Sequence, residues 1–145
     1  MRSATLAMIA ALALAGCGQK AEQRVDEAWV RLGATPVTPG AAYLTIHGGP
    51  TADRLLDVSS PVVIRAEMHE TMASGNMASM KRIEGGVAIP AKGKVEFKPG
   101  GRHVMLFNVN PGIVPPRTLP LIFTFASGER IEVDAALRRA GDAAP

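Results

Sequence analysis

Imidazole and thioether side chains are concentrated in one part of the sequence. Four of the seven Met residues fall between Glu67 and Met80, in the stretch EMHETMASGNMASM, which also contains His69. Met usually fills gaps in an apolar core, but Ser, Gly and Asn interrupt this stretch and it has no apolar period. We interpret it as a loop whose sulfur atoms are available for chemistry.

A second group of the same donors lies in GGRHVML, at residues 100–106. Residues two apart on a β-strand face the same side, so His103 and Met105 would point to one place while Val104 points to the core. Upstream, ten residues separate His69 from Met80. A single fold-back of the chain could bring that pair beside the strand that carries His103. The candidate metal ligands are therefore His69, Met80, His103 and Met105.

This donor set favours a soft metal ion. Zn²⁺ in proteins is held by imidazole, thiolate and carboxylate groups, whereas an uncharged thioether suits Cu(I). A blue-copper centre would also need a Cys ligand. The only Cys of the chain, Cys17, lies in an N-terminal leader. We therefore expect a Cu(I) site that is not blue.

Each candidate also has a purely structural interpretation. A His and a Met two residues apart on a strand more often pack at the edge of a core than bind a metal. An exposed Met cluster can absorb oxidants. His47 ends a predicted strand before a Gly-Gly-Pro turn and is left out of the site. Met72 and Met77 are either loop spacers or secondary copper contacts.

The sequence lacks the common signatures of catalysis. It contains no G-x-S-x-G nucleophile elbow, and no HExxH or phosphate-binding loop. We expect a protein that is not an enzyme. The net charge of +3 comes from scattered basic residues with no basic stripe and few aromatic residues, so we expect no binding to nucleic acid.

The segments that must position these ligands are predicted to be β-strands. Short apolar runs at 25–32, 41–47 and 53–60, and further runs after the Met-rich stretch, are separated by Gly and Pro, which is typical of an all-β sandwich or barrel. Leu121, Phe123 and Phe125 alternate with polar or outward positions, which favours antiparallel sheets with one solvent-exposed face. The aromatic residues on predicted strands are expected in the core: Trp29, Tyr43, Phe97, Phe107, Phe123 and Phe125.

The first residues have the character of an export signal. Arg2 precedes an apolar run that is too short to span a bilayer, and the run ends in Leu14-Ala15-Gly16-Cys17, which resembles a bacterial lipobox. We divide the chain into a lipoprotein signal peptide (1–16), a lipidated Cys and tether (17–24), a copper-binding β domain (25–137) and a flexible C-terminal tail (138–145). Acyl chains on Cys17 would anchor the protein to a membrane on its periplasmic side.

The residues match a known family motif. The pattern resembles the periplasmic copper(I) chaperones called PCuAC, whose motif is His-x10-Met-x21-His-x-Met. His69, Met80, His103 and Met105 fit it, except that 22 residues separate Met80 from His103. The surplus residue is assigned to the turn at Gly85-Gly86. The stretches EMHET and KPGGRHVML carry the most specific part of the resemblance.

The resemblance implies a fold and a function. It implies a cupredoxin-like Greek-key β-barrel that carries Cu(I) near its surface. It further implies delivery of copper to the CuA site of cytochrome c oxidase subunit II, with a thioredoxin-like assembly factor as a possible second partner. We expect a monomer that passes copper by ligand exchange, with segment 70–79 as a mobile lip. The alternative is a copper-buffering or resistance lipoprotein without a dedicated acceptor.

Overall fold

The computed structural model describes residues 22–145. The predicted signal peptide and Cys17 lie outside the described residues, so their assignment stays a prediction. Between residues 22 and 145 no helix is long and apolar enough to cross a membrane. The described chain forms strands only, which confirms the predicted all-β class: β1 (Arg24–Arg31), β2 (Gly40–His47), β3 (Asp53–Ser59), β4 (Val63–Ser74), β5 (Met77–Arg82), β6 (Val87–Ile89), β7 (Lys94–Phe97), β8 (Arg102–Val109), β9 (Thr118–Phe125) and β10 (Arg130–Arg138).

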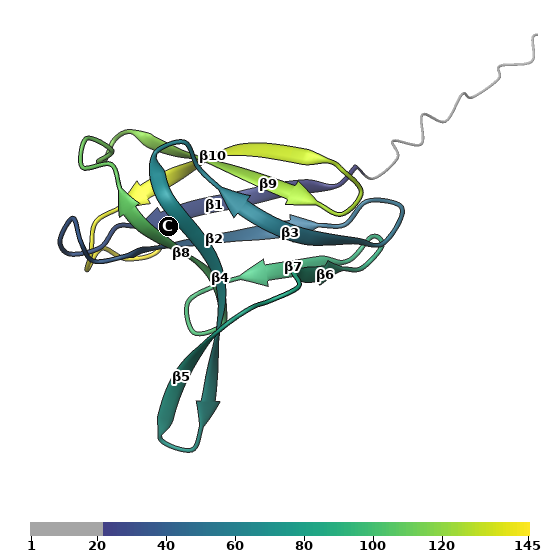
Figure 1. The fold of residues 1–145 in the computed structure, drawn as a ribbon, viewed down its shortest axis with the longest axis horizontal. Helices are drawn as coiled ribbons and strands as arrows, with labels where there is room; N and C mark the ends of the chain where they lie inside the picture. The colour runs from purple at the N-terminus through teal and green to yellow at the C-terminus, as the bar shows by residue number, and fades with distance from the viewer. Residues whose placement is uncertain (1–21) are drawn as a thin grey trace, which may run out of the picture.

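The strands make one curled sheet. Their order is β5-β4-β8-β2-β1-β10-β9-β3-β6, and β7 pairs with the other half of β2. Strands β3 and β4 pair with different neighbours yet contact each other, so the sheet rolls into a barrel around its core (Figure 1). All pairs are antiparallel except β1 with β10. These two strands come from opposite ends of the domain, so the intervening chain is long enough for a parallel connection.

The core follows from alternation along the strands. On β9, Leu121, Phe123 and Phe125 are buried as predicted. On β8, Val104 and Leu106 are fully buried, which turns the odd-numbered residues of this strand outward. Phe107 is therefore an exception to the prediction that strand aromatics are core residues, because it lies on the outer face, where Arg65 covers its ring at 4.2 Å.

The Met-rich stretch is a β-hairpin, so the prediction of a loop was wrong. The 12-residue strand β4 pairs with β8 along its first part and with β5 along its second part. Gly75 turns the chain with a φ of 61°, as a Gly-first hairpin turn requires. Figure 1 shows this hairpin projecting from the barrel. Because both of its faces are exposed at the tip, the sequence carries no alternating burial pattern there.

The C-terminal residues follow β10 along the outside of the barrel. β10 extends to Arg138, and beyond it the Arg139 amide donates to the Asp142 carboxylate at 2.8 Å. The guanidinium of Arg31 on β1 donates to the Asp142 carbonyl oxygen at 3.3 Å. The end of the chain thus contacts the barrel near the end of β1.

Candidate metal centre

Strand register places two of the predicted ligands directly opposite each other. His69 on β4 pairs with His103 on β8, and one step along the same face Glu67 pairs with Met105. Opposite residues on neighbouring strands lie on the same face. His69, His103 and Met105 therefore share the outer face of the sheet, while the intervening Met68 and Val104 point into the core with exposures of 7% and 0%.

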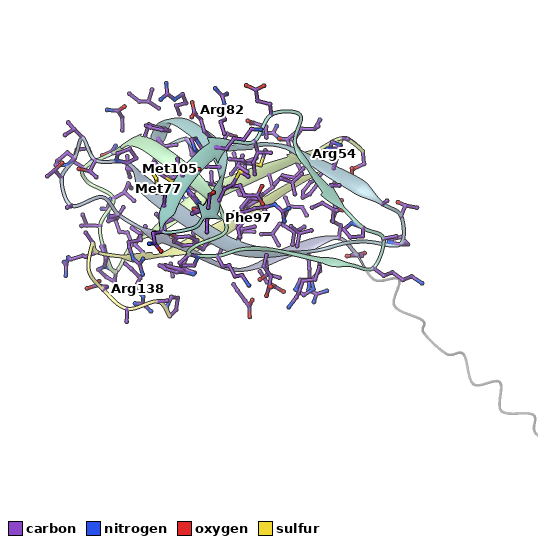
Figure 2. All side chains as sticks on the ribbon, turned by 90° about the horizontal axis from the view of Figure 1, so that it is seen from below. Arg54, Met77, Arg82, Phe97, Met105 and Arg138 are labelled. Carbon is purple, nitrogen blue, oxygen red and sulfur yellow. The ribbon has the colours of Figure 1, made fainter. Side chains whose placement is uncertain are left out.

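The hairpin carries Met80 to the same face. Met80 on β5 pairs with Thr71 on β4, and Thr71 lies two residues beyond His69, so all three face the same way. Met80 is 59% exposed, whereas Met105 is only partly exposed between its strand neighbours. The structure thus brings all four predicted ligands to one face, with the hairpin residue as the most accessible. Figure 2 shows Met105 and Met77 in the left half of the molecule and Arg54 in the right half.

The two imidazoles are close enough to share an ion. Their ring centroids are 6.0 Å apart with an angle of 30° between the planes. Metal–nitrogen bonds of about 2.0 Å, with each nitrogen about 1.2 Å from its ring centre, give centroids about 5.2 Å apart at a tetrahedral N–metal–N angle and about 6.4 Å apart at a linear one. The observed spacing lies between these two values.

In each imidazole ring, one nitrogen has a hydrogen-bond partner within residues 22–145 and the other has none there. His103 is 6% exposed, and its Nδ1 lies 3.0 Å from the carbonyl oxygen of Gly101. His69 Nε2 lies 3.1 Å from Glu67 Oε2, and its Nδ1 is buried without a hydrogen-bond partner. A buried polar atom normally finds a partner, so the orphaned Nδ1 is an observation that a metal ligand would explain.

The carboxylate of Glu67 contacts the His69 ring at Nε2. The side chain of Glu67 is 12% exposed, and its Oε1 meets Arg65 Nε at 3.0 Å and Arg82 Nη1 at 3.6 Å. The hydrogen bond with His69 lowers the pKa of Glu67, and the charges of Arg82 and Arg65 lower it further against the opposing effect of burial. Glu67 is therefore ionised at neutral pH.

Sequence reasoning did not assign a role to Glu67. The carboxylate was visible in the Met-rich stretch, but only its spacing relative to His69 could have identified it. Glu67 precedes His69 by two residues, which is the same spacing that linked His103 to Met105. The rule that residues two apart share a strand face applies equally to both pairs.

The remaining Met and His candidates lie elsewhere. Met72 and Met77 pair with Ser79 and Ser74, and their positions alternate with those of Thr71 and Met80, so they lie on the other face of the hairpin. They are 51% and 78% exposed. His47 sits at the end of β2 and contacts Asp26 at 3.1 Å. These residues do not join the four-residue group.

The turn assigned to the surplus residue is separate from the ligand strands. Gly85 and Gly86, between β5 and β6, have φ angles of 77° and 80°. A Cβ on Gly86 would lie 2.3 Å from the Leu55 carbonyl oxygen, while one on Gly85 would meet open space. The register between β4 and β8 does not depend on this turn.

The donor set consists of two imidazoles and two thioethers. Residues 22–145 contain no group of three or more His, Cys, Asp or Glu side chains arranged to hold a metal. The thioethers of Met80 and Met105 are further donors that this face offers beside the two imidazoles. Soft, uncharged sulfur donors of this kind select Cu(I) among the common metal ions.

The comparison with protein families finds one matching family over most of the chain. The model of the LpqE-like family, described as "Putative lipoprotein LpqE-like", matches residues 24–137. A protein of Leifsonia xyli subsp. xyli (strain CTCB07) named "Putative lipoprotein Lxx21020" is 25% identical over 140 residues, covering 88% of this chain and 83% of that protein.

Solved structures of PCuAC domains share the fold. The copper-bound PCuAC domain from PmoF2 superposes with a TM-score of 0.66 and 20% identity, covering 83% of this chain and 95% of that one. The solution structure of CuI-DR1885 from Deinococcus radiodurans superposes with a TM-score of 0.62 and 24% identity, covering 86% and 83%. The predicted cupredoxin-like fold of PCuAC domains is confirmed.

Proposed function

From the premise that this chain belongs to the LpqE-like family, whose model it matches over residues 24–137, we propose that it is a Cu(I) carrier of the bacterial cell envelope. His69, Met80, His103 and Met105 would hold the ion. The role is binding and transfer, without a catalytic step. Copper is the cargo of the protein and leaves it at each cycle.

One observation carries the proposal. Two imidazoles lie opposite each other on β4 and β8, with ring centroids 6.0 Å apart and one buried nitrogen unpartnered, and both candidate thioethers share their face. A set of imidazole and thioether donors suits Cu(I) better than Zn²⁺ or Cu(II). The copper-bound neighbours among the solved structures support the same metal.

The arrangement also suits release of the ion. Met80 is 59% exposed on a projecting hairpin, so a recipient could displace this ligand first without disturbing the barrel. Thiolates of an acceptor bind soft Cu(I) more strongly than neutral thioethers do. We propose a CuA domain of cytochrome c oxidase subunit II as the acceptor, with a thioredoxin-like assembly factor as a further partner.

The proposed location follows from the leader and the relatives. The sequence Leu14-Ala15-Gly16-Cys17 fits acylation of Cys17, and the family and the Leifsonia relative both carry the name lipoprotein. We propose that the protein is anchored to a membrane at the periplasmic side through this residue. Mass spectrometry of the protein purified from membranes would test this, since an unmodified Cys17 contradicts it.

Metal binding is tested by titration with Cu(I) against a competing chelator. We expect one tightly bound ion and its loss when His103 and Met105 are both replaced by Ala. The double variant Met72→Ala/Met77→Ala is the matched control and keeps the ion. Circular dichroism establishes that both variants remain folded. Absence of uptake, or uptake unchanged in the His103/Met105 variant, contradicts the proposal.

A storage role is the second candidate, because Met72 and Met77 expose two further thioethers on the other face of the hairpin. A buffering protein would bind several Cu(I) ions and lose the additional ones in the Met72/Met77 variant. A carrier would bind one and pass it to an apo-CuA domain. Mixing the copper-loaded protein with that domain and measuring metal in each after separation distinguishes the two.

A further inference from the structure

Glu67 divides its two carboxylate oxygens between different partners. Oε1 faces Arg65 and Arg82, at 3.0 and 3.6 Å, and Oε2 faces His69 Nε2 at 3.1 Å. The side chain is 12% exposed. Because the two guanidinium groups occupy one oxygen, the other oxygen is held in a fixed position toward the imidazole.

The partners of the two rings dictate where each proton sits. An ionised carboxylate and a backbone carbonyl can only accept hydrogen bonds. His69 must therefore donate from Nε2 to Glu67, and His103 must donate from Nδ1 to the Gly101 carbonyl oxygen at 3.0 Å. The neutral rings then carry their lone pairs on opposite atoms, Nδ1 of His69 and Nε2 of His103.

We propose that Glu67 is a positioning residue that fixes the tautomer of His69, so that the site binds its ion through Nδ1 of His69 and Nε2 of His103. The buried, unpartnered Nδ1 of His69 is the atom that this arrangement leaves free. The inference rests on the proposed function for its metal, but the tautomer is a property of the metal-free protein. A carboxylate behind a ligating imidazole also orients the ring and raises its basicity.

The charge and the hydrogen bond of Glu67 can be separated by substitution. Glu67→Gln keeps an amide oxygen that accepts from Nε2 but loses the negative charge. Glu67→Ala loses both. Glu70→Ala is the matched control, because Glu70 also pairs with an arginine, Arg102 at 3.6 Å, while its position alternates with His69 along β4.

The test is ¹⁵N NMR of the imidazole nitrogens in the metal-free protein at a pH where both rings are neutral. We expect the Nε2–H form for His69 and the Nδ1–H form for His103. Glu67→Ala should convert His69 to a tautomer mixture and leave His103 unchanged. Glu67→Gln and Glu70→Ala should both retain the wild-type forms. An Nδ1–H form of His69 in the wild type, or no change in Glu67→Ala, overturns the inference.

Cu(I) titration of the same variants completes the test. Loss of such a supporting carboxylate typically lowers metal affinity 10–100-fold, which we expect for Glu67→Ala, with a smaller loss for Glu67→Gln and none for Glu70→Ala. An unchanged affinity in Glu67→Ala also overturns the positioning role. The expected tautomers in a wild-type protein that takes up no Cu(I) would refute the proposed function but not the role of Glu67 toward His69.

Discussion

The two candidate thioether ligands differ in how firmly the protein holds them. Met105 lies within β8, paired with Glu67 on one side and Ala41 on the other, so its strand is fixed from both edges. Met80 lies on the edge strand β5, which has a single neighbour. A ligand held in place costs less conformational entropy to bind than one that must first be ordered, so the two should contribute differently to affinity.

Replacing Met105 by Leu removes the sulfur while nearly conserving side-chain volume. We expect this variant to lose at least about tenfold in Cu(I) affinity, equivalent to about 1.4 kcal/mol, with little change in thermal stability. Met80→Leu should lose less affinity and should also slow transfer of copper to an acceptor. Competition titration gives the affinities, and Met72→Leu serves as control. Equal affinity of Met105→Leu and wild type would exclude Met105 as a ligand.

The β4–β5 hairpin is the element that completes the site. Most of its side chains beyond Thr71 are exposed, so backbone pairing and the turn hold it together with little help from burial. Gly75 is central to the turn, because its φ of 61° lies in a region that β-branched residues avoid. A Cβ at this position would meet nothing within 4 Å, so the cost of a substitution there is conformational and not steric.

Gly75→Val should therefore loosen the hairpin without unfolding the barrel. We expect faster amide hydrogen exchange across residues 70–82 and a lower Cu(I) affinity, because Met80 is no longer held beside His69, while the melting temperature of the barrel changes little. Ala78→Val places the same side chain in a strand of the same hairpin, where β-branched residues are favoured, and should leave exchange unchanged. Equal exchange in the two variants would contradict this role of the turn.

At the scale of the whole molecule, Asp53 ties three segments together. Its Oδ1 accepts from the Ser127 amide at 3.0 Å and from the Arg54 amide at 2.8 Å, and its Oδ2 accepts from the Ser127 hydroxyl at 2.6 Å and from Gln23 Nε2 at 3.1 Å. This carboxylate links the start of β3 to the β9–β10 turn and to the residue before β1. Burial alone would raise the pKa of Asp53, but the hydrogen bonds from Ser127, Arg54 and Gln23 together outweigh it and lower the pKa.

We expect Asp53→Ala to lower the free energy of unfolding by about 1–2 kcal/mol at neutral pH. Because the folded pKa of Asp53 is below its unfolded value, this stabilisation is present above the unfolded pKa and disappears as pH falls through the folded pKa. The difference in urea unfolding between wild type and variant should thus begin to shrink as pH falls below about 4 and disappear below the folded pKa of Asp53. Asp57→Ala, on the same strand but without such contacts, is the control. A difference that persists at low pH would show that the ionised carboxylate is not the cause.

The all-β fold was predictable because burial of one strand face produces a period-two pattern of apolar residues in the sequence. Leu121, Phe123 and Phe125 alternate with half-buried residues. This pattern depends only on the strand geometry and on the burial of one face of the sheet. The same rule correctly predicted that Val104 faces inward. The alternation rule could not predict the β-hairpin at residues 70–82. Both faces of that hairpin are exposed to solvent, so its residues show no alternation of apolar and polar types.

The sequence by itself determined the all-β class and the residue types that could bind a soft metal, since side-chain chemistry and strand periodicity are local properties of the chain. Only the tertiary structure decided which of these residues meet. The register between β4 and β8 sets His69 opposite His103 and leaves Met72 and Met77 on the other face, because a shift by one residue would reverse every side chain. The two-residue spacing places Glu67 on the face of His69, but which imidazole nitrogen meets Glu67 or the Gly101 carbonyl oxygen depends on ring orientations that only the structure shows.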